Sequence, residues 1–99
     1  AKVVNYVKEN YMDCNLSLSS IAEALDRNPR HVSKAFKEAT DMGIMDYINS
    51  IRIEKAKELM ANKSYSTQEI SEKVGYANVR TFRRAFEKET GETPASWRL

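Results

Sequence analysis

A degenerate internal repeat with a period of about 50 residues is the feature that most restricts the fold of this chain. The segment from Ile21 to Leu25 aligns with the segment from Ile70 to Val74. After one extra residue in the second copy, the aligned pairs continue in the same order: Val32 with Phe82, Ala35 with Ala85, Phe36 with Phe86, Thr40 with Thr90 and Tyr47 with Trp97. Two copies are too few for a solenoid, which needs about three or more. The sequence therefore predicts two similar structural units.

Hydrophobic periodicity predicts helices nearly throughout, because apolar residues recur at spacings of three and four. Asn28 before Pro29, and Ser66 with Glu69 in a capping box, are typical helix starts. Seven helices are expected, and the second of them begins at one of the serines at 17, 19 and 20 and ends at residue 25. The other six lie at about 2–11, at 29–40, at about 44–61, at about 67–74, at 79–90 and at 94–97. No segment has the pattern of a β-strand. We expect an all-α chain with about seven helices.

Each copy of the repeat contains a short helix, a tight turn and a longer helix, which is the layout of a helix-turn-helix. In such a unit the first helix packs across the second and holds it out toward the major groove of DNA. The residues expected to pack the two units are Ile21, Leu25, Val32 and Phe36 in the first and Ile70, Val74, Phe82 and Phe86 in the second. Ala35 and Ala39 complete the apolar stripe of the longer helix in the first unit, and Ala85 that in the second. The methionines at 12, 42, 45 and 60 are also expected in the core.

The predicted organisation is two helix-turn-helix subdomains joined by a long central helix. The first subdomain spans residues 1–43, the linker helix 44–62 and the second subdomain 63–99. At 1.5 Å per residue, the central helix is about 27 Å long. That length fits two recognition helices about one turn of DNA, ~34 Å, apart.

Basic residues dominate the sides of the two longer helices that the apolar stripes leave free. In the first copy these are Arg30, Ser33, Lys34 and Lys37, and in the second Arg80, Arg83, Arg84 and Glu87 or Lys88. Residues at these spacings share one helix face. The whole chain has a formal net charge of only +2, so the basic residues are concentrated rather than merely abundant. This asymmetry is typical of a DNA-binding surface.

Composition excludes several other classes of protein. With 41% hydrophobic and 30% charged residues, the chain is too apolar to be disordered and too charged to span a membrane. Cys14 and His31 are the only residues of their types, so a disulfide, a metal site and a catalytic dyad all lack partners. We therefore expect no enzyme activity, no cofactor and no metal. The absence of a signal-peptide pattern favours a cytoplasmic protein, and a start at Ala1 rather than Met suggests a fragment of a longer chain.

The order and spacing of these residues resemble the AraC/XylS family of bacterial transcription regulators. The resemblance covers about residues 16–98, including Arg52 and Ala56 of the connecting helix. It is most specific in the second unit, which contains Ile70-Ser71, Val74-Gly75-Tyr76, Phe82, Phe86 and Gly91-Glu92-Thr93-Pro94-Ala95-Ser96-Trp97-Arg98. The first unit departs from the family at Asp41-Met42-Gly43, because a glycine usually follows the position of Thr40 directly. The end of the third helix is therefore left open.

The resemblance implies that both units bind adjacent major-groove segments of a double-stranded DNA operator. Carried over by position, the candidates for base contacts are Arg30, Ser33 and Lys34 in the first unit and Val79, Arg80, Arg83 and Arg84 in the second. Candidates for phosphate contacts are Ser19, Ser20, His31, Lys37, Ser66, Thr67 and Lys88. The family also implies an attached sensor or receiver domain, and activation through RNA polymerase. The opening segment is most similar to members with a receiver domain.

A rival interpretation remains open on the sequence alone. The same basic faces would suit a helical protein-interaction module that binds an acidic protein partner. Salt dependence separates the two, because contacts to several DNA phosphates make the affinity fall steeply as salt rises.

Overall fold

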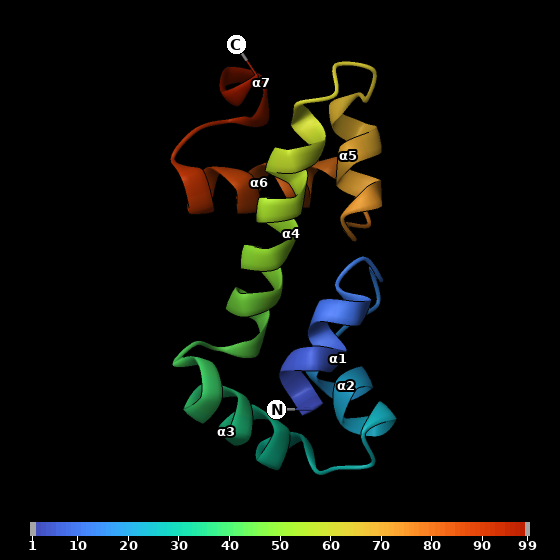
Figure 1. The fold of residues 1–99 in the computed structure, drawn as a ribbon, viewed down its shortest axis with the longest axis vertical. Coiled ribbons are helices and arrows are strands. Elements are labelled where there is room, and N and C mark those ends of the chain that lie inside the picture. Colours follow the sequence, from blue (N-terminus) through green and yellow to red (C-terminus); the bar gives the residue numbers. More distant parts are fainter. Residues whose placement is uncertain (1, 99) are drawn as a thin grey trace.

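The computed structural model describes residues 2–98, and within them every regular element is a helix. The seven helices are α1 (Lys2–Asn10), α2 (Leu18–Ala24), α3 (Pro29–Thr40), α4 (Ile44–Met60), α5 (Thr67–Lys73), α6 (Val79–Thr90) and α7 (Pro94–Trp97). The molecule is elongated, with extents of 43 × 21 × 20 Å. Figure 1 shows α4 along the long axis, with α1 to α3 at one end and α5 to α7 at the other. The expectation of an all-α chain with about seven helices is confirmed.

Two separate hydrophobic cores form, one at each end of α4. Ile44 and Ile48 of α4 join the first core, where the largest buried side chain is Phe36 of α3. Ile53 and Ala56 of α4 join the second core, which is centred on α6. The remaining members of the first core are Val3, Val7, Leu16, Ile21, Ala22 and Val32, and those of the second are Met60, Ile70, Val74, Tyr76, Phe82 and Phe86. Since α4 contributes one half to each core, its position relative to both units is fixed by burial of apolar side chains.

The repeat is reproduced in the caps of the helices. Ser17 and Ser66 open α2 and α5 with capping boxes, in which each hydroxyl accepts a hydrogen bond from the backbone N–H three residues later. Asn28 and Asn78 likewise cap α3 and α6 with their side-chain oxygens. These caps satisfy backbone N–H groups that have no partner inside the helix. The serine at position 17 is thus the one that opens the second helix.

The end of α3 is settled by Asp41. It has a left-handed backbone with φ of 60°, and its equivalent in the second unit, Gly91, has φ of 80°. Asp tolerates this conformation better than most residues that carry a Cβ atom. Thr40 and Thr90 each donate a hydrogen bond to the carbonyl four residues earlier and accept one from the N–H two residues later. Helices α3 and α6 therefore end in the same way, although only α6 has glycine there.

Some residues expected in the core are instead exposed. Ala35 and Ala39 of α3 face solvent, so the buried stripe of this helix consists of Val32 and Phe36 alone. Helix α3 contacts α1, α2 and α4, and these contacts bury only the side that carries Val32 and Phe36. Met12 and Met45 are also exposed, at 50% and 44% of their surface, whereas Met60 is buried. A methionine can therefore match the helical periodicity of the sequence and still lie at the surface.

Candidate nucleic-acid interface

The exposed side of α3, here called the α3 face, carries the residues that the sequence predicted for the first unit. Its members are Arg30, Ser33, Lys34 and Lys37, and all four are exposed. At 3.6 residues per turn, these positions lie opposite Val32 and Phe36, which are 1% exposed. The two buried residues hold α3 against its unit and direct the four polar ones outward.

The α6 face, defined as Arg80, Arg83, Arg84 and Lys88, has a similar construction. Its three arginines occupy the repeat positions of Arg30, Ser33 and Lys34, but the position of Lys37 is taken by Glu87, and the lysine follows one residue later. All four residues are exposed, and Phe82 and Phe86 on the opposite side are completely buried. Val79 differs from the other base-contact candidates, since it is half-buried and packs against the second core. Its side chain has less surface to offer a ligand than the three arginines have.

The two faces occur on helices that are arranged alike. Figure 1 shows α3 and α6 lying across the long axis near opposite ends of α4, both running in the same sense. Each of these helices has a net charge of +2, so the rest of a chain with net charge +2 must be acidic by two charges. At 17 residues, α4 is about 26 Å long. Positive charge is therefore concentrated on two helices that lie near opposite ends of α4 and run in the same sense.

The cations of these faces are not neutralised by the protein's own carboxylates. Within residues 2–98 there are three ion pairs, and Lys88 is the only member of either face among them. Its Nζ lies 3.9 Å from the Asp46 carboxylate, and both side chains are largely exposed. Exposed pairs of this kind are worth at most about 1 kcal/mol. In this part of the chain, the arginines of the α6 face and both Arg30 and Lys34 have no ion pair.

The remaining phosphate-contact candidates differ in exposure and in whether their side chains already form hydrogen bonds within the protein. Ser20 is engaged, because its hydroxyl accepts from the N–H of Ser17 and donates to the Ser17 carbonyl. Ser66 is similarly used in its capping box. Ser19 and His31 are exposed, and Thr67 is half-buried at the first turn of α5. The first turns of α2 and α5 still present backbone N–H groups, which suit phosphate oxygens.

Arg52 is a structurally important residue to which the sequence assigned no function. It is only 5% exposed, and it lies on the buried side of α4 between Ile48 and Ala56. Its Nε donates to the Tyr11 carbonyl at 2.7 Å, and its Nη2 donates to the Asp13 carbonyl at 2.9 Å. The sequence did contain a signal for a special role of this residue, because Arg52 stands four residues from an apolar position on either side. Buried cations are rare unless they are paired, so an arginine at such a position is expected to have partners.

The turn between α5 and α6 meets this arginine from the other side. The Arg52 guanidinium lies 5.1 Å from the centre of the Tyr76 ring, and the Tyr76 hydroxyl donates to Asn49 Oδ1 at 2.8 Å. Burial raises the pKa of Tyr76 to about 12, while the positive charge of Arg52 acts in the opposite direction. Burial also lowers the pKa of Arg52. We call this set (Tyr11 to Asp13, Asn49, Arg52, Gly75 and Tyr76) the Arg52 junction.

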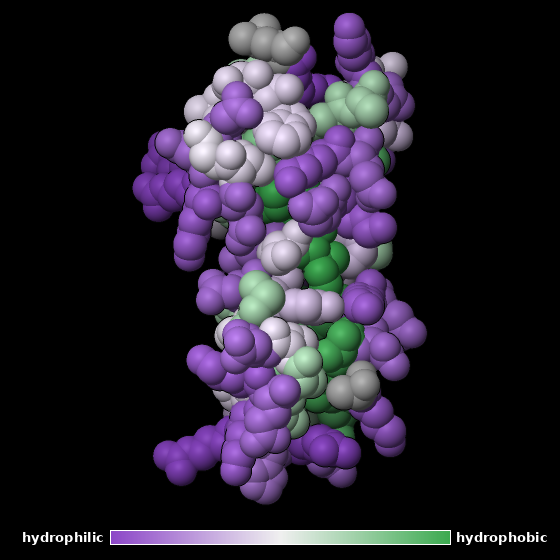
Figure 2. All heavy atoms as spheres, turned by 60° about the vertical axis from the view of Figure 1, so that its left-hand side comes forward, coloured by the Kyte–Doolittle hydropathy of each residue, from purple (hydrophilic) through white to green (hydrophobic). Residues whose placement is uncertain are grey.

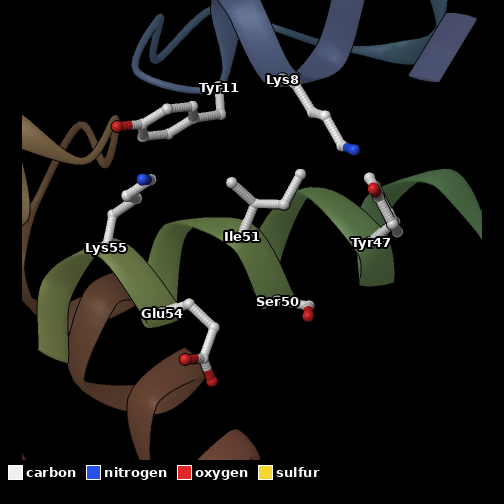
Figure 3. Close-up of a pocket in the computed structure, with 7 residues that line it drawn as sticks. All are labelled: Lys8, Tyr11, Tyr47, Ser50, Ile51, Glu54 and Lys55. Atoms are coloured by element: carbon white, nitrogen blue, oxygen red, sulfur yellow. The ribbon is translucent and has the colours of Figure 1, made fainter. Parts of the chain in front are cut away.

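A shallow pocket of about 450 Å³ lies between α1 and α4, away from both basic faces. In Figure 3, Lys8 and Tyr11 line one side and face five residues of α4: Tyr47, Ser50, Ile51, Glu54 and Lys55. Figure 2 shows that hydrophilic side chains cover most of the neighbouring surface and that apolar ones form a narrow band along the long axis. None of the DNA-contact candidates lines this pocket.

Two kinds of feature are absent from residues 2–98. No helix there combines the length and the apolar character needed to cross a membrane. Nor do three or more metal-ligating side chains come together in that range.

Comparison with known proteins agrees with this architecture. A family model described as a helix-turn-helix domain matches residues 21–99. The crystal structure of the C-terminal domain of the two-component response regulator yesN from Fusobacterium nucleatum is 33% identical, with a TM-score of 0.92 over 98% of this chain and 94% of that one. The C-terminal domain of AraT, a response regulator from Geobacillus stearothermophilus, is 31% identical, with a TM-score of 0.94 over 98% of this chain and 80% of that one.

Among curated sequences, the bifunctional transcriptional activator/DNA repair enzyme AdaA of Bacillus subtilis is 30% identical over 97% of this chain and 45% of its own length. The chain thus spans less than half the length of this relative, and 12% and 35% of the length of two others. The family model covers most of the chain, and the repeated fold and its cationic helices agree with that match. The chain therefore belongs to the AraC-type helix-turn-helix family, whose members bind DNA and regulate transcription.

Proposed function

We propose that this chain binds double-stranded DNA sequence-specifically, with α3 and α6 entering adjacent segments of the major groove. The observation that carries the proposal is that two equivalent helices at opposite ends of α4 present cations at two matching positions, Arg30 with Arg80 and Lys34 with Arg84, and that none of these four has an ion pair within residues 2–98. A major groove about 12 Å wide admits one α-helix. Two grooves on the same side of B-DNA are about 34 Å apart, which fits within the 43 Å length of the molecule.

Base contacts are assigned to Arg30, Ser33 and Lys34 on α3 and to Arg80, Arg83 and Arg84 on α6. Arginine can donate two parallel hydrogen bonds to O6 and N7 of guanine, which contribute about 1–3 kcal/mol of discrimination per pair. Val79 is proposed to contact a thymine methyl group with the part of its side chain that stays exposed. Three arginines on α6 against one on α3 favour a more G-rich half-site for the second unit.

Phosphate contacts are assigned to residues that flank these helices. Lys37 and Lys88 lie toward the ends of the two faces, and His31 lies near the start of α3. The first turns of α2 and α5 contribute backbone N–H groups and the side chains of Ser19, Ser66 and Thr67. Ser20 would join them only by exchanging its hydrogen bond to the Ser17 carbonyl for one to a phosphate oxygen. Such contacts fix the position of a protein on the duplex without carrying sequence information. The proposal therefore divides the interface into a base-contacting centre and a phosphate-contacting border.

The whole protein is proposed to contain a further domain that receives a signal, because this chain covers only part of its relatives. Two of the similar structures belong to response regulators, which favours a receiver domain. Contact with RNA polymerase and activation of transcription are proposed from the description of AdaA as an activator. With DNA and RNA polymerase as its partners, the protein is proposed to act in the bacterial cytoplasm.

The test begins with selection of duplexes from a random 30-bp pool, chosen to span about three turns of B-DNA. Affinity for the selected duplex is then measured by fluorescence anisotropy. We expect Arg84→Ala to cost about 1–3 kcal/mol and to relax base preference at one position. Lys34→Ala should also weaken binding, and both variants should unfold at the wild-type temperature because both side chains are exposed. Lys63→Ala, in the loop after α4, removes the same charge away from both faces and serves as the control.

Two results would refute the proposal. The first is unchanged DNA affinity in both Arg84→Ala and Lys34→Ala, which would mean that the faces are wrongly assigned. The second is an affinity that does not fall with salt, since each phosphate contact contributes about −0.9 to the slope of log affinity against log salt. The second result would favour an acidic protein partner instead.

A further inference from the structure

Arg52 connects two parts of the chain that share no hydrophobic core. The first core contains Ile48 and the second contains Ile53, so the boundary between the cores falls within one turn of α4, next to this residue. The guanidinium donates to carbonyls at Tyr11 and Asp13, in the loop between α1 and α2 of the first unit. The other cations of α4 behave differently: Lys55 and Lys57 pair with glutamates of their own helix.

The second unit packs against the same guanidinium. Gly75 lies so close that a Cβ atom added there would be 2.9 Å from Arg52 Nε, 2.5 Å from the Tyr11 carbonyl oxygen and 3.0 Å from the backbone of Met12. The next residue, Tyr76, places its ring 5.1 Å from the guanidinium. The α1–α2 loop of one unit and the α5–α6 turn of the other therefore meet around one side chain.

This contact restricts the movement of one unit relative to the other, which α4 alone does not prevent. A single helix joining two units can bend and twist, and small changes along it become large displacements at its ends. The α5–α6 turn leads directly into α6, whose N-cap is Asn78, three residues after Gly75. Its partner, the α1–α2 loop, precedes the helix that supports α3. The packing of the loop and the turn around Arg52 thus resists rotation of one recognition helix relative to the other.

We propose that Arg52 is a positioning residue that sets the distance and the rotation between α3 and α6, and so the spacing between DNA half-sites that the chain accepts. This inference rests on the proposed function, in which both helices bind one duplex. Each inserted base pair moves one half-site by about 3.4 Å along the axis and by about 35° around it, since B-DNA has about 10–10.5 base pairs per turn. A rigid pair of units should tolerate neither change.

The experiment uses the duplex selected by the wild-type chain, the same duplex with one or two base pairs inserted between the half-sites, and a duplex with one half-site scrambled. For the wild type, we expect an insertion to remove most of the benefit of the second half-site, about tenfold or more in affinity. Arg52→Met keeps similar volume but removes the fork of donors. It should bind the scrambled duplex as the wild type does, bind the original duplex about tenfold more weakly, and respond less than about threefold to the insertion.

Two controls separate positioning from folding and from charge. Arg52→Lys retains the charge and cannot bridge two carbonyls in the same planar geometry, so it should flatten the response to spacing as well. This variant decides the question if Arg52→Met does not fold, as judged by circular dichroism. Lys63→Met loses the same charge at an exposed position and should keep the wild-type dependence on spacing.

The possible failures are distinguishable. If the wild type selects no duplex with two half-sites, or ignores the insertion, the proposed function itself fails. If the wild type depends strongly on spacing and both Arg52 variants fold and show the same dependence, the proposed function stands and the role of Arg52 is refuted. Loss of binding to the scrambled duplex in a folded variant would also overturn the inference, because Arg52 would then act within one unit.

Discussion

Replacing Gly75 with alanine tests the close approach of the two units directly. Two independent penalties apply at this position. Its φ of +104° is a backbone conformation that costs a residue with a Cβ atom about 1–2 kcal/mol. The added Cβ would also lie 2.5 Å from the Tyr11 carbonyl oxygen, and forcing extra volume into a packed site costs about 1–3 kcal/mol. We expect Gly75→Ala to lower the free energy of unfolding by about 2–5 kcal/mol.

Gly91→Ala is a matched control for the backbone penalty. This residue also has a positive φ, +80°, but an added Cβ would have no neighbour within 4 Å. Its substitution should therefore cost only the backbone term, about 1–2 kcal/mol. The difference between the two variants isolates the contact between the α5–α6 turn and the α1–α2 loop, which we expect to be about 1–3 kcal/mol.

Urea denaturation at 25 °C measures both values. Circular dichroism follows helix content, and fluorescence follows Trp97, the only tryptophan, whose ring packs edge-on against Phe86 at 5.6 Å. Coincident transitions of the two probes are needed before a free energy is extracted. Equal losses in Gly75→Ala and Gly91→Ala would contradict the argument, because the turn would then have room for a methyl group and the units would not be in tight contact.

Two further predictions concern the second core. Phe86→Ala should lower the free energy of unfolding by about 3–5 kcal/mol, since the ring is completely buried and contacts Phe82 and Trp97; a thermal melt at the wild-type temperature would contradict this. Alkaline pH should also destabilise the fold through Tyr76, whose pKa is raised from 10.0 to about 12. A raised pKa means that the folded state favours the protonated phenol, so this contribution is complete below pH 10 and is lost as the pH rises toward 12. Urea titrations between these pH values should show a smaller loss for Tyr76→Phe than for the wild type, and equal losses would show that Tyr76 is not responsible.

The sequence by itself determined the local structure and its duplication. Helix starts at Asn28, Ser66 and Asn78 are encoded within three residues, because a side chain caps a backbone N–H close to it in the chain. The buried stripe of Phe82 and Phe86 is likewise fixed by the helical period. The residues of α3 and α6 that lie outside the buried stripes include most of their cations, so the α3 and α6 faces could be predicted without a structure. The exposure of Ala35 and Ala39 could not be predicted in this way, since the width of a buried stripe depends on how the neighbouring helices pack against it.

Only the tertiary structure decided how the two units are joined. The helix expected at about 67–74 ends at Lys73, just before Gly75. The equivalent of Gly75 in the first unit, Asp26, adopts φ of 54° with a side chain, so the turn alone does not require glycine. Glycine is needed at position 75 because the backbone of Tyr11 and Met12 lies against it. Arg52 is bound to carbonyls 39 and 41 residues away in the chain. Periodicity and capping describe neighbours within about one helical turn, whereas these contacts exist only once both units are folded against α4.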